Sequence, residues 1–154
     1  MYMKLMMSLI KYLFLINFIY LPAIIQAQVV YGVATYISDG DTFRFLASDG
    51  IKLKVRVADI DCPEKVQPYG LEAKEFVLKS IEGKEITLNI QYTDRYGRKV
   101  ARVGFDNKDL SEELLRNGLA WHYKKHSKEV LLAMIEQKAK DEKVGLWSKE
   151  FPIA

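Results

Sequence analysis

Two stretches decide the fold: S-D-G-D-T-F-R-F at residues 38–45 and I-K-L-K-V-R-V-A-D-I-D-C-P-E at residues 51–64. Each lies at or just after an Asp-Gly pair, which favours a tight turn because glycine adopts positive φ without steric cost. In residues 51–57 apolar and basic side chains alternate strictly, as in a half-buried β-strand. Together with a strand at 42–46 and a β-branched, aromatic segment at 29–37, they predict a meander of three strands.

The rest of the chain predicts one helix, two strands and two more helices. The expected elements are a helix at 71–82 that Gly83 ends, strands at 86–91 and 98–105 joined by a turn at 92–97, a short helix that Asp109 opens and Gly118 ends, and a last helix that Ser127 caps and Gly145 ends. The buried stripe of the last helix is predicted to be Leu131, Met134, Ile135 and Ala139. Five strands with helices packed at one end are compatible with an α+β fold: a Greek-key barrel of the OB type with three helices.

The first 27 residues differ from all that follow. They carry Lys4 and Lys11 but no acid, then an almost wholly apolar run at 12–25, and they end in the small residue Ala27. This layout is typical of a secretory signal that is cut before Gln28. Residues 28–154 would then form one exported domain, in the periplasm or the medium. The alternative is an uncleaved membrane anchor, since the apolar run is of marginally sufficient length.

Net charge says little about a partner. The formal charge of +3 includes the two lysines of the first 27 residues, so residues 28–154 carry 21 basic and 20 acidic side chains. A bulk attraction to a polyanion is therefore weak. Local clusters matter more, and the basic ones are Lys52-Lys54-Arg56, Arg95-Arg98-Lys99-Arg102 and Lys124-Lys125-His126-Lys128.

The single cysteine, Cys62, excludes an internal disulfide. Two interpretations of it stay open: a catalytic thiol with His122 or His126 as base, or a small packed hydrophobe. The two histidines are four residues apart, a spacing that suits zinc on a helix, but no nearby acid or cysteine completes that set. A solvated basic rim is the simpler interpretation of both.

Three carboxylates and one guanidinium fall at the predicted strand ends: Asp41, Asp61, Glu64 and Arg56. Carboxylates gathered at one point repel one another unless a cation lies among them, which favours a hard divalent ion with oxygen ligands. An arginine beside such an ion suggests a phosphate substrate. For Asp41 alone, ordinary turn chemistry is an equal explanation. A helix-loop-helix calcium loop is excluded, because its sixth and twelfth positions hold Arg44 and Gly50.

At this point the chain resembles a known family. Residues 28–148 are similar to the thermonucleases, whose best-known member is staphylococcal nuclease. The segments that carry the resemblance are S-D-G-D-T (38–42), V-R-V-A-D-I-D-C-P-E (55–64), P-Y-G-L-E-A (68–73), T-D-R-Y-G-R (93–98), N-G-L-A-W (117–121) and G-L-W-S (145–148). Each segment is short, but their joint order and spacing are specific.

The resemblance implies an OB-fold barrel with calcium-dependent phosphodiesterase activity. It places the metal ligands on Asp41, Asp61 and the backbone carbonyl of Cys62, where many members have threonine. It places the phosphate-binding arginines on Arg56 and Arg98 and the water-activating carboxylate on Glu64. Substrate contacts fall on Arg95 and Tyr96, and an aromatic platform on Tyr123. The loop between Glu64 and Tyr69 is shorter than in the staphylococcal enzyme. The resemblance therefore does not determine how substrate reaches the site or which substrate is preferred.

Together with the signal-like segment at residues 1–27, the resemblance predicts a monomeric, exported nuclease that requires Ca²⁺ and cuts single-stranded or locally melted DNA and RNA with little sequence preference. Two alternatives stay open. OB folds also bind single strands without chemistry. An uncleaved N-terminal segment would instead make the chain a membrane-tethered interaction protein.

Overall fold

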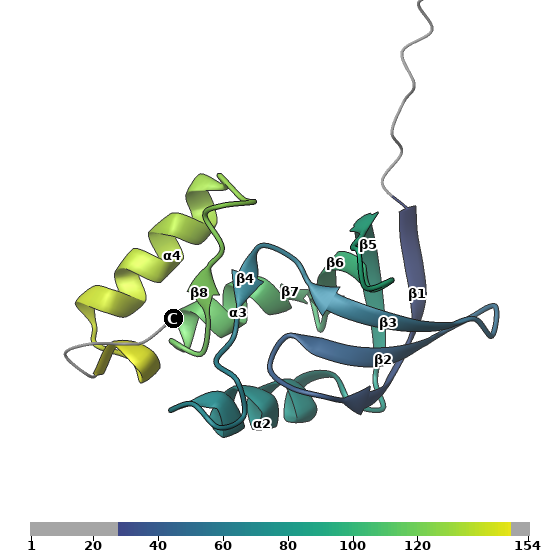
Figure 1. The fold of residues 1–154 in the computed structure, drawn as a ribbon, viewed down its shortest axis with the longest axis horizontal. Coiled ribbons are helices and arrows are strands. Elements are labelled where there is room, and N and C mark those ends of the chain that lie inside the picture. Colours follow the sequence, from purple (N-terminus) through teal and green to yellow (C-terminus); the bar gives the residue numbers. More distant parts are fainter. Residues whose placement is uncertain (1–27, 149–154) are drawn as a thin grey trace, which may run out of the picture.

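The computed structural model describes residues 28–148, and its centre is a closed barrel of five strands (Figure 1). The barrel strands are β1 (Gln28–Ile37), β2 (Thr42–Ala47), β3 (Lys52–Val57), β5 (Glu85–Thr93) and β6 (Lys99–Phe105). Antiparallel pairs run in the order β3-β2-β1-β5-β6, and a parallel pairing of β3 with β6 closes the barrel. The predicted OB-type barrel is thereby confirmed.

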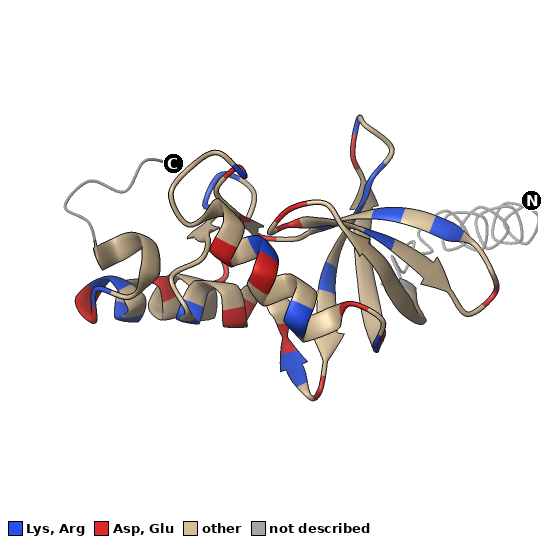
Figure 2. Ribbon diagram, turned by 90° about the horizontal axis from the view of Figure 1, so that it is seen from below, with Lys and Arg blue, Asp and Glu red and all other residues tan. Residues whose placement is uncertain are grey.

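Alternation of apolar and polar residues explains the barrel wall. In β2, Phe43 and Phe45 are buried while Arg44 between them is exposed. In β3, Val55 and Val57 are buried and Lys54 is exposed. Because side chains of a strand point to opposite faces in turn, one face of this hairpin fills the core and the other carries the cations. Figure 2 shows these cations as blue bands along the long hairpin, with red at its tip.

Three α-helices lie among residues 28–148. They are α2 (Gly70–Ile81), α3 (Leu110–Arg116) and α4 (Val130–Asp141), and a 3-10 turn, η1 (Gly145–Ser148), follows them. The barrel lies at one end of the molecule and α4 at the other, with α3 between them (Figure 1). Within residues 28–148, no helix combines the length and apolar character needed to cross a bilayer.

Short strands add detail that the sequence did not predict. The segment after β3 contains β4 (Ile60–Asp61), which pairs with β8 (Trp121–His122). A further two-residue strand, β7 (Lys108–Asp109), extends the sheet beside β6. The β4–β8 pair fixes the chain beside Asp61 against the segment that leads into Tyr123.

The expected helix starts are confirmed in one case and wrong in another. Asp109 caps α3 by accepting a hydrogen bond from the Glu112 amide at 3.1 Å. Ser127 does not cap α4: the N-cap is Glu129, and the Ser127 hydroxyl oxygen accepts from the Glu129 amide instead.

The predicted stripe of α4 is also partly wrong. Ile135 and Ala139 are buried, but Leu131 and Met134 are exposed, and Leu132 and Glu136 take their places in the interior. The physical reason is Glu136, whose carboxylate accepts from the His122 amide and pairs with Lys124 and Lys140. That buried polar contact turns the helix away from the orientation that hydrophobicity alone favours.

The signal segment predicted at residues 1–27 and the last residues, 149–154, lie outside the described part of the chain.

Candidate active site

Five residues that the sequence singled out line one cavity of about 210 Å³: Asp41, Arg56, Asp61, Glu64 and Arg98. The barrel brings them together in two ways. The β2–β3 register pairs Thr42 with Arg56, so Asp41 lies beside the end of β3. The parallel closure pairs Arg56 with Val100, two residues beyond Arg98.

The two aspartates share a single guanidinium. Arg56 Nη2 donates to Asp61 Oδ1 at 2.7 Å. Arg56 Nη1 lies 2.7 Å from Asp41 Oδ2 as an ion pair, without the alignment of a hydrogen bond. Arg56 therefore places a positive charge between the two carboxylates.

Asp41 is the more constrained of the two carboxylates. It is buried, Oδ1 accepts from the Thr42 hydroxyl at 2.9 Å, and Oδ2 accepts from the Cys62 amide at 3.2 Å. Burial raises the pKa of Asp41 to about 6, although the neighbouring Arg56 charge opposes the shift. Burial thus disfavours the charged form of Asp41 more than the single guanidinium favours it.

The donors fit a hard cation in kind. Two carboxylates offer oxygen atoms at the cavity wall, and calcium prefers such ligands together with backbone carbonyls. Among residues 28–148, however, no group of three or more His, Cys, Asp and Glu side chains is arranged to hold a metal ion. The predicted set is compatible with this result because its third member, at Cys62, is a carbonyl.

Arg98 reaches the cavity from the turn before β6. Its Nε donates to Asp94 Oδ2 at 2.7 Å, and Nη1 lies 3.4 Å from the Thr42 hydroxyl. Asp94 also accepts from the amides of Tyr96 and Arg98, which makes the turn rigid. Asp94 thus holds the Nε side of the Arg98 guanidinium, while Nη1 contacts the Thr42 hydroxyl, which itself donates to Asp41.

Glu64 is exposed at the cavity edge, after Pro63. Its amide donates to the Gln67 side chain, and its carbonyl accepts from the Gln67 amide at 2.8 Å. These contacts fix the backbone of Glu64, while its carboxylate forms no ion pair within the described chain. Such a carboxylate is available to a water molecule or a substrate.

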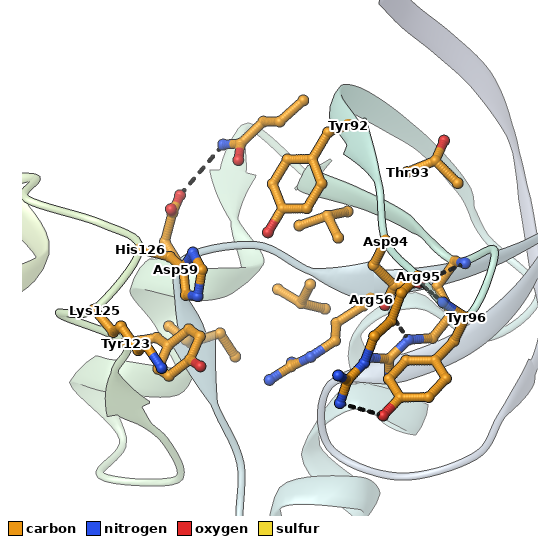
Figure 3. Close-up of a pocket in the computed structure, with 15 residues that line it drawn as sticks. Arg56, Asp59, Tyr92, Thr93, Asp94, Arg95, Tyr96, Tyr123, Lys125 and His126 are labelled. Atoms are coloured by element: carbon orange, nitrogen blue, oxygen red, sulfur yellow. Dashed lines mark hydrogen bonds and ion pairs between the residues drawn. The ribbon is translucent and has the colours of Figure 1, made fainter.

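A larger groove of about 720 Å³ adjoins the cavity, and Arg56 and Arg98 line both. Figure 3 shows Tyr123, Lys125 and His126 on one side of it and Tyr92, Arg95 and Tyr96 on the other, with Arg56 between the two groups. The three residues predicted to contact substrate, Arg95, Tyr96 and Tyr123, all line this groove.

Aromatic and basic groups interleave in the groove. Arg95 lies 4.8 Å from the Tyr96 ring centroid and Arg98 lies 5.5 Å from it, while Arg95 also donates to the Tyr96 hydroxyl. On the other wall, the rings of Tyr123 and His126 are 4.9 Å apart. His126 was expected in a solvated rim, and its contact with Tyr123 was not predicted.

Arg102 organises the wall that carries Tyr123, a role that its membership of a basic cluster in the sequence did not predict. Its guanidinium pairs with four carboxylates, which belong to Asp59, Asp109, Glu112 and Glu129. The Asp59 carbonyl in turn accepts from the Tyr123 amide at 2.8 Å. Arg102 thereby joins β6 to the starts of α3 and α4 and to the Tyr123 segment. Only the three-dimensional convergence of its acids reveals this role.

The alternative chemistries proposed for Cys62 and the histidines are not supported. Cys62 is buried, and burial raises the pKa of its thiol, so it stays protonated and packs as a hydrophobe. His122 is buried and not part of a solvated rim, and its two ring nitrogens have no hydrogen-bond partner in the described structure. His126 lines the groove instead, so the pair does not form a zinc site.

Comparison with known proteins identifies the family of the chain. The model of the family described as staphylococcal nuclease homologue matches residues 54–149. An uncharacterized endonuclease of Escherichia coli O157:H7 is 31% identical over 144 residues, which cover 93% of each chain. The chain belongs to the staphylococcal nuclease homologue family.

Other relatives differ in size. An uncharacterized endonuclease of Haemophilus influenzae is 34% identical over 117 residues, or 76% of this chain and 66% of that protein. A staphylococcal-like nuclease of Arabidopsis thaliana is 41% identical over 101 residues, which are 66% of this chain and 31% of the plant protein. The chain thus matches less than a third of the length of that plant relative.

Proposed function

We propose that this chain is an exported, calcium-dependent nuclease that hydrolyses phosphodiester bonds of DNA and RNA with little sequence preference. The observation that carries the proposal is the convergence of Asp41, Arg56, Asp61, Glu64 and Arg98 on one small cavity beside a basic, aromatic groove. Relatives named as nucleases and endonucleases support the same reaction class.

The residues of the cavity have complementary roles in this reaction. Hydrolysis of a phosphodiester needs an aligned water molecule and neutralisation of the charge on the phosphoryl and leaving oxygens. Glu64 accepts or orients the proton of the water. Arg56 and Arg98 bind phosphoryl oxygens through their planar forks. By analogy with loss of one preorganised donor, removing either arginine costs about 3 kcal/mol in the transition state.

Asp41, Asp61 and the Cys62 carbonyl would hold the calcium ion. When bound, calcium supplies positive charge that stabilises the developing charge on the phosphoryl group. Arg56 then has to serve two partners, since the aspartates that hold it here are the proposed metal ligands. A guanidinium shared in this way is already positioned at the cavity before substrate arrives.

The adjoining groove suits a flexible, single-stranded substrate. Aromatic rings stack on any base, and nearby cations attract the phosphate backbone, so such a surface binds without strong sequence preference. Tyr96 and Tyr123 on opposite walls, with Arg95 beside the former, provide both elements. Locally melted duplex regions would bind in the same manner. In this proposal the chain acts as a monomer.

Export remains a proposal based on residues 1–27. If the segment is a cleaved signal, mass spectrometry of the secreted protein finds an N-terminus at Gln28. An intact N-terminus in a membrane fraction would support the anchored alternative instead.

The decisive test is hydrolysis of denatured DNA and of RNA with calcium and with a chelator, by the wild type and by Asp41→Asn and Glu64→Gln variants. We expect turnover with calcium only, and its loss in both variants. Activity that survives chelator and Asp41→Asn would refute the mechanism. Binding of single strands without turnover under any divalent ion would favour a binding module.

A further inference from the structure

A row of cations runs along the outer face of the β2–β3 hairpin and ends at the active site. Lys52, Lys54 and Arg56 alternate along β3, on the side away from the buried Val55 and Val57. The strand register places Arg44 of β2 opposite Lys54. Because a strand rises about 7 Å for every two residues, Lys54 and Lys52 lie about 7 and 14 Å from Arg56 along β3.

These cations are not neutralised by neighbouring acids. Within residues 28–148, no carboxylate forms an ion pair with Arg44, Lys52 or Lys54. The β1 strand has no charged residue, and Asp49, at the hairpin tip, is the only acid between residues 42 and 57. Arg102 makes the contrast clear, since its charge is engaged by four carboxylates. The hairpin face is therefore a local positive surface on a nearly neutral domain.

The face also carries an aromatic group and is hollowed. Arg44 lies 5.4 Å from the ring centroid of Tyr36, its cross-strand partner on β1, and Lys74 of α2 lies 5.9 Å from the same ring. Tyr36 is 49% exposed, so its ring remains accessible. A depression of about 640 Å³ lies on this face, and Arg44, Lys52 and Lys54 all line it.

We propose that this face, with Arg44, Lys52 and Lys54 as its phosphate contacts and Tyr36 as an aromatic one, is a second nucleic-acid-binding track. The inference rests on the proposed nuclease function and extends it. The Tyr96–Tyr123 groove lies beyond the C-terminal end of β3, whereas the track leads from Arg56 toward residue 52. A single strand whose scissile phosphate is at Arg56 would thus be held on both sides of the cut, in the groove and along the hairpin.

Charge complementarity decides the occupant. Evenly spaced cations along an extended strand match the repeating phosphates of an extended polynucleotide, and an adjacent ring offers stacking to a base. A consequence is a dependence on substrate length: a trinucleotide fills the cavity and groove, whereas only a longer strand reaches Lys52. The track therefore favours internal positions of long strands.

The test compares Arg44→Gln/Lys52→Gln/Lys54→Gln with a control that also removes three positive charges, Lys79→Gln/Lys84→Gln/Lys138→Gln. The control lysines are exposed and pair with acids elsewhere. Binding of a labelled 30-nucleotide DNA strand is measured in chelator at increasing salt. Loss of three phosphate contacts should lower the slope of log K against log salt by about 2. The ratio of kcat/KM for the 30-mer to kcat/KM for a trinucleotide should fall on the order of tenfold relative to the control.

Equal salt slopes and equal length ratios in the two triple variants would overturn the track. So would a loss of binding to anionic phospholipid vesicles in the track variant with unchanged DNA binding, which would indicate a membrane-facing surface. A wild type that hydrolyses no nucleic acid would refute the proposed function separately, because the binding measurement does not depend on turnover.

Discussion

The backbone of Glu64 packs directly on Gly70, and a Cβ at Gly70 would lie 2.0 Å from the Glu64 carbonyl oxygen. Only glycine allows the first turn of α2 to approach the Glu64 loop so closely. The helix therefore acts as a support for the residue that we propose to align the water.

Gly70→Ala should displace the Glu64 loop and lower kcat at least tenfold, while single-strand binding in chelator changes little. The control is Gly83→Ala, where a Cβ meets no atom within 4 Å and the only cost is a φ of +72°. That cost is about 1 kcal/mol of stability, with no effect on kcat. Wild-type kcat in Gly70→Ala would show that the position of Glu64 does not depend on this contact.

Calcium should stabilise the folded protein even without substrate. A ligand that binds only the native state contributes about 2.7 kcal/mol at a hundredfold excess over its Kd. Thermal unfolding of the wild type should therefore shift to higher temperature with calcium relative to chelator. Asp41→Asn should abolish this shift because it removes a proposed ligand. An equal shift in both proteins would place calcium binding elsewhere.

Arg102 should contribute more to stability than an ordinary exposed ion pair does. Its side chain is only 17% exposed, and Arg102→Gln would leave four acids facing one another. We expect a loss of about 3 kcal/mol in the free energy of unfolding. Arg116→Gln is the matched control, since its half-exposed ion pairs should contribute less than about 1 kcal/mol. Urea unfolding measures both, and similar losses would contradict the prediction.

His122 should make stability fall in mildly acidic solution. Burial lowers its pKa in the native state below the ordinary value of 6.5. The unfolded chain then binds the proton more readily, so stability is lost as pH falls below about 6.5. Asp41 acts in the opposite sense, because its raised pKa lets the native state bind more protons between 3.8 and about 6.

Comparing the wild type with His122→Gln isolates the histidine, because Asp41 is common to both. In chelator, the difference in unfolding free energy should shift in favour of His122→Gln as pH drops from 7.5 to 5.5. A difference that does not vary with pH would mean that the His122 ring is protonated to the same extent in the native and the unfolded state.

Sequence patterns predicted the barrel because alternation in residues 51–57 and the two Asp-Gly turns are local signals. The gathering of Asp41, Arg56, Asp61, Glu64 and Arg98 was predicted too, since the acids follow strands and the family resemblance supplied the rest. The features that the sequence did not predict depend on tertiary contacts. Nothing local in the sequence indicates that one guanidinium pairs with both Asp41 and Asp61, or that a buried Glu136 turns α4.

The ion pairs of Arg102 also depend on tertiary contacts that the sequence does not reveal. Its four acids come from loops and helix starts far apart in the chain, so no window of sequence contains the set. Leu131 and Met134 have helical spacing with Ile135 and still face solvent. Periodicity finds an apolar stripe, but a buried carboxylate with three partners can outweigh it.

The parallel pairing that joins β3 to β6 determines when the proposed nuclease could first damage the nucleic acid of the cell that makes it. Arg56 lies on β3 and Arg98 directly precedes β6, so the two arginines come together only where these strands pair. An unfolded or half-formed chain therefore has acids and arginines but no place where they converge. If the chain crosses a membrane unfolded, the proposed nuclease activity arises only when the chain folds on the other side. The producing cell would then need no separate inhibitor during synthesis.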